Sequence, residues 1–142
     1  MALLSNGLAG LTGIPPLDWL PSVSRINGAV WQSAVLGAGT RIRGVPRMRL
    51  TLRSAPAAGT LVGYLYDVDG TGTGRLVAAA PVTWTASTTS VETIFPVTAY
   101  DVPAGHRLAL VLDTKDPLYL DANGFGTALT VADPSWVDVP VR

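Results

Sequence analysis

The chain contains no cysteine, and Lys, Glu, Gln and His each occur only once among its 142 residues. Without cysteine, the protein has no disulfide framework, no thiol nucleophile and no zinc–thiolate site. Charged residues make up 14% of the chain, whereas about 25% is usual in soluble domains. The ten basic and ten acidic side chains cancel, and no basic tail is present. This balance argues against a protein that binds nucleic acid through electrostatic attraction.

Long hydrophobic runs are also missing. The opening segment, MALLSNGLAGLTGIPPLDWLP, is apolar, but it lacks a basic stretch at its start. Glycine and proline interrupt it at Gly7, Gly10, Gly13, Pro15 and Pro16, well short of the roughly 20 apolar residues of a membrane helix. We therefore expect neither a signal peptide nor a membrane anchor. The compartment stays open, and the cytoplasm is favoured.

The residues that are abundant favour strands. Thr and Val are frequent, and 15 Gly and 11 Pro are spread along the chain. Nine of the ten acidic residues are Asp, which suits turns better than helix interiors. Because good formers of exposed helix are nearly absent, the composition predicts an all-β domain of short strands joined by turns.

Alternation with a period of two locates eight strands. The clearest is Val45–Ser54, in which Met48, Leu50 and Leu52 share one face. In Thr60–Asp67 both faces are apolar. The other candidates are Ala29–Leu36, Arg75–Pro81, Ser90–Val97, Arg107–Asp113, Thr127–Val131 and Trp136–Val141. Eight short strands separated by turns predict a two-sheet sandwich or barrel, the jelly roll included.

The first 28 residues differ from the rest, because nothing in them gives alternating strand faces. We expect one short helix over Ala2–Leu11, followed by a proline-rich stretch that runs past Trp19. Residues 1–28 are thus interpreted as a lead-in segment that must lie against an apolar surface. Residues 29–142 form the predicted β domain.

His106 is the only candidate for an imidazole base, and the G-x-S-x-G motif of a serine nucleophile is absent. A single His also argues against a catalytic zinc site. We favour a turn position for His106, in Val102-Pro-Ala-Gly-His-Arg107, where it precedes a strand and hydrogen-bonds to local backbone. The sequence therefore assigns no catalytic residue and no cofactor.

One loop has the composition of a calcium site, Asp67-Val-Asp69-Gly-Thr71-Gly. The oxygens of Asp67, Asp69 and Thr71 are the ligand type that a hard cation prefers. The EF-hand pattern also requires Glu at its twelfth position, where this chain has Ala78. We therefore prefer a Gly/Asp turn between two strands.

Two surface features have alternative interpretations. Five arginines lie close together at Arg41, Arg43, Arg47, Arg49 and Arg53. No aromatic residue lies among them for base stacking, so we expect a solvated or ion-paired face instead of a nucleic-acid site.

The aromatic residues that are candidates for a sugar-binding platform are Trp19, Trp31, Trp84, Trp136, Tyr64, Tyr66, Tyr100 and Tyr119. A sandwich core or an interface uses the same residue types, and we expect most of them there. A carbohydrate-binding module remains the alternative function, with Trp84 and Tyr119 as its test positions.

The order of several short motifs resembles a known family. The motifs are Val30-Trp-Gln-Ser33, Ile42-Arg-Gly-Val-Pro46, Leu65-Tyr-Asp-Val68, Pro103-Ala-Gly-His-Arg-Leu108 and Asp113-Thr-Lys-Asp-Pro117. From Val30 to Arg142 the chain resembles the C-terminal non-catalytic domain of X-Pro dipeptidyl-peptidases and cocaine-esterase-like acyl hydrolases. The motif residues, which we expect to be structural, are Trp31, Gly44, Pro46, Asp67, Gly105, His106, Arg107 and Asp116.

The resemblance implies a galactose-binding-like jelly roll that follows an α/β-hydrolase domain carrying a Ser–Asp–His triad. That domain and its nucleophile are missing from this sequence, so the resemblance implies an accessory domain without catalysis of its own. Its partner would be the catalytic domain of the same parent chain, on which it packs and whose active-site entrance it shapes. An exposed apolar lead-in predicts a homo-oligomer when the domain is isolated.

Overall fold

The structure is a computed structural model that describes residues 17–23, 28–115, 123–124 and 128–142. The expected helix over Ala2–Leu11 and the candidates Asp116 and Tyr119 lie outside these residues. Within the described part, nearly all regular structure is strand, and no helix is long and apolar enough to span a membrane. The all-β prediction is confirmed.

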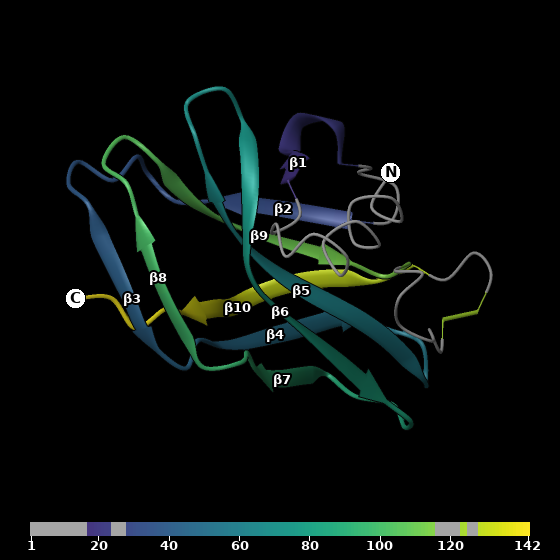
Figure 1. The fold of residues 1–142 in the computed structure, drawn as a ribbon. Coiled ribbons are helices and arrows are strands. Elements are labelled where there is room, and N and C mark those ends of the chain that lie inside the picture. The colour runs from purple at the N-terminus through teal and green to yellow at the C-terminus, as the bar shows by residue number, and fades with distance from the viewer. Residues whose placement is uncertain (1–16, 24–27, 116–122, 125–127) are drawn as a thin grey trace, which may run out of the picture.

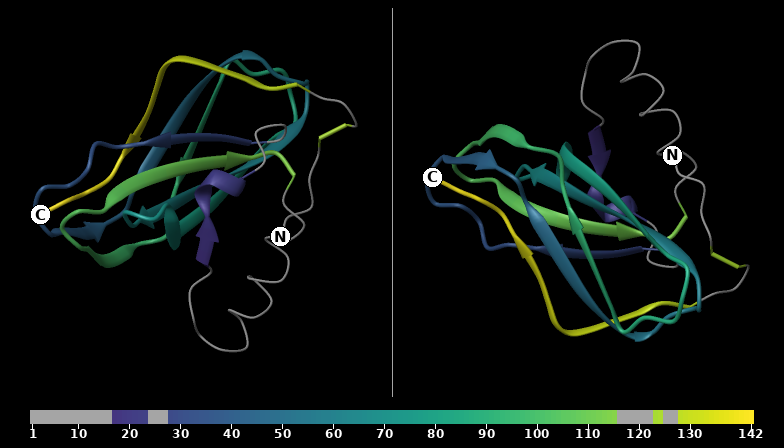
Figure 2. Two further views of the ribbon diagram at one scale, coloured as in Figure 1. Left: turned by 90° about the horizontal axis from the view of Figure 1, so that it is seen from above. Right: turned by 90° about the horizontal axis from the view of Figure 1, so that it is seen from below.

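The strands form antiparallel sheets that pack as a sandwich (Figures 1 and 2). The five-stranded sheet contains, in spatial order, β1 (Leu17–Trp19), β6 (Thr73–Trp84), β5 (Gly59–Val68), β9 (Arg107–Asp113) and β2 (Gly28–Gln32). The three-stranded sheet contains β10 (Thr130–Asp138), β4 (Arg47–Ser54) and β7 (Ser90–Ile94). A two-stranded sheet pairs β3 (Thr40–Gly44) with β8 (Thr98–Val102).

The main core fills the space between the sheets. Met48, Leu50 and Leu52 are buried on β4, as their alternation predicts, whereas the arginines that alternate with or flank them are exposed. They belong to the same apolar cluster as Leu61 and Leu65 of β5. Alternation along β4 thus orients one face toward the core and the other toward solvent.

A second apolar cluster lies on the opposite face of the five-stranded sheet. Every residue of β5 is buried, because its alternate side chains enter two different clusters. The second cluster comprises Leu20, Val62, Tyr64, Tyr66, Val68, Ala109 and Val111. The central strand is therefore covered on both faces.

The lead-in segment contributes to this sheet, so the expectation that it holds no strand is wrong for Leu17–Trp19. β1 pairs with the start of β6, and the Tyr66 hydroxyl donates a 2.8 Å hydrogen bond to Asp18. Leu20, in the 3₁₀ turn Leu20–Ser22, lies so close to Gly74 that a Cβ there would come within 2.2 Å of its Cδ1. Three residues are too few for a period of two to be recognised.

Other strand boundaries also differ from the prediction. The expected strand Ser90–Val97 ends at Ile94, and β8 starts after Pro96. β8 and its partner β3 were not predicted, because neither sequence has a strong apolar alternation.

The two strands expected over Thr127–Val131 and Trp136–Val141 are one strand, β10. From Ala132 to Trp136, four steps along β10 lie opposite only two steps along β4, so the strand bulges around Pro134. Thr51 holds the bulge, because its amide donates to Ser135 Oγ at 2.9 Å and its hydroxyl donates to the Pro134 carbonyl. Proline interrupts strands in general but is accepted at bulges and on edge strands.

The core predicts a clear contrast between two residues on either side of Pro96. Phe95 is 2% exposed and Val97 is 79% exposed. We expect Phe95→Ala to lower the free energy of unfolding by about 3–5 kcal/mol, because it removes a buried ring and leaves a cavity. Val97→Ala should stay within about 0.5 kcal/mol of the parent protein. Urea denaturation followed by circular dichroism measures both, and equal effects would contradict the described burial.

Candidate functional site

A buried carboxylate organises one end of the sandwich. Asp67, near the end of β5, is 5% exposed. Its Oδ2 accepts a 2.8 Å hydrogen bond from the Tyr100 hydroxyl, and its Oδ1 lies 2.8 Å from Nδ1 of His106. An ionised carboxylate only accepts hydrogen bonds, so Nδ1 of His106 donates. The three side chains join β5, β8 and the loop before β9.

The position of His106 directly before β9 agrees with the prediction, and its amide donates to the Pro103 carbonyl of the same turn. Its side chain, however, bonds outside this turn. The ring bonds to Asp67, which lies 39 positions earlier in the chain. Burial, followed by the hydrogen bond to Asp67, raises the pKa of Tyr100 to about 12. The arrangement is suited to holding strands together, because the polar atoms of all three residues face one another.

The other motif residues of the described part lie on strands or in the short connections between strands. Gly105 has a φ of 85°, a conformation that other residues rarely adopt, and its amide donates to the Leu36 carbonyl. Gly44, with a φ of 141°, ends β3 beside Pro140. The carbonyl of buried Pro46 accepts from the amide of Phe95. Arg107 begins β9, and Trp31 is on β2.

The loop considered for calcium is the turn between β5 and β6. Oδ1 of Asp69 accepts hydrogen bonds from the amides of Thr71 and Thr73 and from the Thr71 hydroxyl. These bonds, that of the Thr71 side chain first, lower the pKa of Asp69. The Asp67 carboxylate bonds instead to Tyr100 and His106. The turn is confirmed, and both carboxylates have partners within the chain.

Arginines of the predicted stripe form ion pairs across neighbouring strands. Arg49 of β4 lies 3.0 Å from Glu92 of β7, and Arg43 of β3 pairs with Asp101 of β8. Arg43 also donates to the Tyr100 carbonyl. These contacts fit an ion-paired strand face.

The structure corrects one position proposed for sugar binding. Trp84 is buried in the main core, where its indole NH donates a 2.9 Å hydrogen bond to the Pro56 carbonyl. Its ring is therefore unavailable as a platform. Trp31 and Trp136, by contrast, are each 46% exposed.

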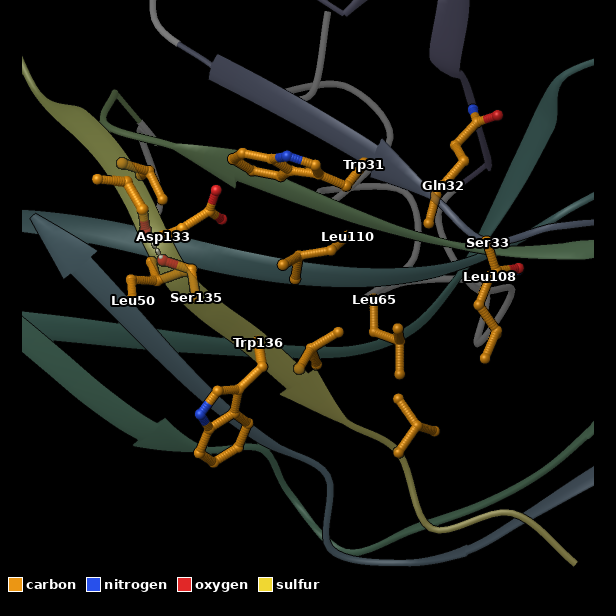
Figure 3. Close-up of a pocket in the computed structure, with 15 residues that line it drawn as sticks. Trp31, Gln32, Ser33, Leu50, Leu65, Leu108, Leu110, Asp133, Ser135 and Trp136 are labelled. Atoms are coloured by element: carbon orange, nitrogen blue, oxygen red, sulfur yellow. Dashed lines mark hydrogen bonds between the residues drawn. The ribbon is translucent and has the colours of Figure 1, made fainter.

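A cleft of about 660 Å³ opens between β2 and β9 on one side and β10 on the other (Figure 3). It exists because β2 and β10 are edge strands of the two sheets. Leu50, Leu65 and Leu110 contribute to its lining, and Trp31 and Asp133 lie at its rim. Asp133 was not among the site residues expected from the sequence, although an Asp-Pro pair next to a strand pattern is a signal for a bulge.

An apolar corner lies where β3 continues into β4 and β7 into β8. We use "apolar corner" for Val45, Ile94 and Val97, which are all exposed. Hydrogen bonding between Phe95 and Pro46, and the pairing of Gly44 with Thr98, place Val45 and Val97 on neighbouring chain segments. Clustered exposed apolar side chains mark interaction surfaces.

The sandwich, its turn-forming motifs and its structural histidine define a β-sandwich module, and comparison identifies its family. Residues 16–136 match the X-Pro dipeptidyl-peptidase C-terminal non-catalytic domain. The chain belongs to this family, as its motif order indicates. The match begins next to β1, so it includes the part of the lead-in that joins the sheet.

Solved structures share the fold. An alpha-amino acid ester hydrolase has a TM-score of 0.68 and 18% identity over 83% of this chain. An aminopeptidase from a marine sediment archaeon, Thaumarchaeota archaeon, has a TM-score of 0.68 and 14% identity over 88% of it. This chain spans only 26% and 27% of the length of those two proteins. No curated protein matches the sequence.

Removal of the Asp67 carboxylate should destabilise the domain. Asp67→Ala deletes the acceptor for Tyr100 and His106, and each hydrogen bond to a charged group contributes about 1.5–3 kcal/mol. Asp101→Ala, which removes an exposed acid from its ion pair with Arg43, should cost no more than about 1 kcal/mol. Urea denaturation compares the two variants. A smaller loss for Asp67→Ala than for Asp101→Ala would exclude a supporting role for the buried carboxylate.

Tyr100 should make the protein sensitive to alkaline pH. Its pKa in the folded protein is about 12, above the value of about 10 expected in the unfolded chain. The stabilisation that the protonated Tyr100 hydroxyl contributes to the fold is therefore complete below pH 10 and is lost as pH rises toward 12. We expect the free energy of unfolding to fall less steeply between pH 10 and 12 in Tyr100→Phe. Part of the decline should remain, because burial and Asp18 also raise the pKa of Tyr66. Denaturant unfolding at several pH values measures both slopes, and identical slopes would refute the assignment to Tyr100.

Proposed function

We propose that this chain serves as the accessory domain of a serine hydrolase of the X-Pro dipeptidyl-peptidase or acyl-esterase type, and that it packs on the catalytic α/β-hydrolase domain of the same parent chain. The observation that carries this proposal is the family match over residues 16–136. The size relation to the two structural neighbours supports it, since this fold accounts for about a quarter of each longer chain.

The apolar corner is the surface that we assign to this contact. Ile94 and Val97 are 67% and 79% exposed, and apolar surface of this kind is unfavourable in water. Burial of apolar area stabilises by roughly 25 cal/mol per Å², so a partner surface that covers this corner gains free energy from it. The corner is also anchored, because Phe95 and Pro46 beside it are buried.

A fixed corner gives the accessory domain a mechanical role. The chain segments of the apolar corner connect strands of two different sheets. A partner that binds there is therefore held in a fixed position relative to both sheets. Loops of the sandwich would then stand at a constant place beside the catalytic domain. We propose that they shape the entrance of its active site.

The test compares the same substitution in two contexts. Val97→Asp should change the free energy of unfolding of the isolated domain by no more than about 0.5 kcal/mol, because the side chain is exposed there. In the full reading frame that contains the hydrolase domain, it should lower the midpoint of thermal unfolding and increase cleavage between the domains by a protease. Both effects follow from a charge placed in an apolar contact.

Val35→Asp is the matched control, since Val35 is also an exposed valine but lies after β2, outside the apolar corner. It should have no effect in either context. If the two variants behave alike in the full chain, the corner is not the contact surface.

A further inference from the structure

The cleft between β2 and β10 combines an apolar interior with a single charged group. Leu50 and Leu65 at its base are almost fully buried. Its volume of about 660 Å³ falls within the range of about 300–1,000 Å³ that is typical of small-molecule sites. Among the described residues that line it, Asp133 is the only charged one.

The Trp31 side chain lies on the face of its sheet that also carries the main core. On β9, Leu110 lies directly opposite Trp31 and contributes to the main core. Directly opposite residues of an antiparallel pair project to the same face, so Trp31 extends from β2 over the cleft. Figure 3 shows its ring at the rim, above Leu110. Its exposed fraction of 46% leaves ring surface available to a ligand.

Asp133 reaches the same rim from β10. It lies in the bulge between Ala132 and Trp136, and hydrogen bonds from Thr51 hold this bulge in place. Figure 3 shows its carboxylate directed toward the side of the cleft on which the Trp31 ring lies. In the part of the chain that the structure describes, this carboxylate has neither a hydrogen bond nor an ion pair. Asp133 is exposed, so its carboxylate is open to a ligand that enters the cleft from solvent.

The geometry points to a binding site for a small organic cation, an amine or guanidinium on an apolar body. The carboxylate of Asp133 attracts the cation, and the face of an indole such as Trp31 binds positive charge through its quadrupole. The leucines at the base accommodate the hydrocarbon part. Because the described lining residues include no basic side chain, an anionic ligand would meet no positive charge there. This site is separate from the apolar corner and does not depend on the proposed contact with a catalytic domain.

Trp136 provides a matched comparison. It also borders the cleft and is also 46% exposed, but it lies opposite Arg49, on the outward face of β4. Figure 3 shows its ring turned away from the other labelled side chains. The two tryptophans thus have the same exposure but different orientations toward the cleft.

The experiment is a titration of the isotope-labelled chain with 2-phenylethylammonium, followed through the indole NH signals by NMR. The neutral isostere 2-phenylethanol and the disaccharide cellobiose serve as comparison probes. Trp31→Phe and Trp136→Phe assign the signals. We expect the Trp31 signal to shift with the ammonium ion, the buried Trp84 signal to stay constant, and the alcohol to bind about tenfold more weakly, as expected for a charge-assisted contact.

Two pairs of variants test the residues. Asp133→Asn should weaken binding of the ammonium ion about tenfold, the equivalent of losing one charge-assisted hydrogen bond. Asp138→Asn, an exposed acid on the same strand, removes the same charge and should not weaken it. Trp31→Ala should weaken binding, and Trp136→Ala should not. The dispersion of the NMR spectrum verifies that each variant is folded.

Equal affinity for the ammonium ion and the alcohol would overturn the proposal and leave a merely apolar cleft. Binding of cellobiose in preference to the amine would overturn it in favour of a carbohydrate module. Absence of any shift at the solubility limit of the probes would also overturn it.

Discussion

The central strand β5 has two apolar faces, and neither can be left in water. Leu61 and Leu65 enter the core between the sheets, while Val62 and Tyr64 enter the cluster on the opposite side. A sandwich alone covers only the first face. The second face therefore recruits Leu20 from the lead-in, and this requirement explains why that segment joins the sheet as β1. The composition, rich in apolar residues and poor in charge, is that of a domain with two cores.

The only histidine of the chain shows how a polar group is accommodated beside such cores. Asp67 continues the inward-facing series of β5, where an unpaired carboxylate would be costly. Tyr100 and His106 supply its hydrogen bonds from β8 and from the turn before β9. The imidazole thus supports the fold by bonding to a carboxylate of the central strand.

Apolar alternation within a single segment was enough to predict several strands. The alternation of β4 is confirmed, and the prediction of Arg107–Asp113 for β9 agrees at both ends. Pairing across the chain was beyond such patterns. β1 is defined by its neighbour β6, and the bond between Asp67 and His106 joins positions far apart in sequence. The cleft likewise depends on how two edge strands approach each other, so the Asp133-Pro134 pair could indicate a bulge but not a position at the rim of a cleft.

The bulge in β10 has a consequence for the behaviour of the protein at high concentration. An edge strand offers a row of free backbone groups to which a strand of another molecule can add. In β10, Pro134 has no amide hydrogen to donate, and the residues around it leave the regular register. A foreign strand that began to pair at either end would meet this interruption within a few residues. The irregular segment thus limits templated growth of the sheet and helps to keep a sparsely charged protein from forming fibrous aggregates.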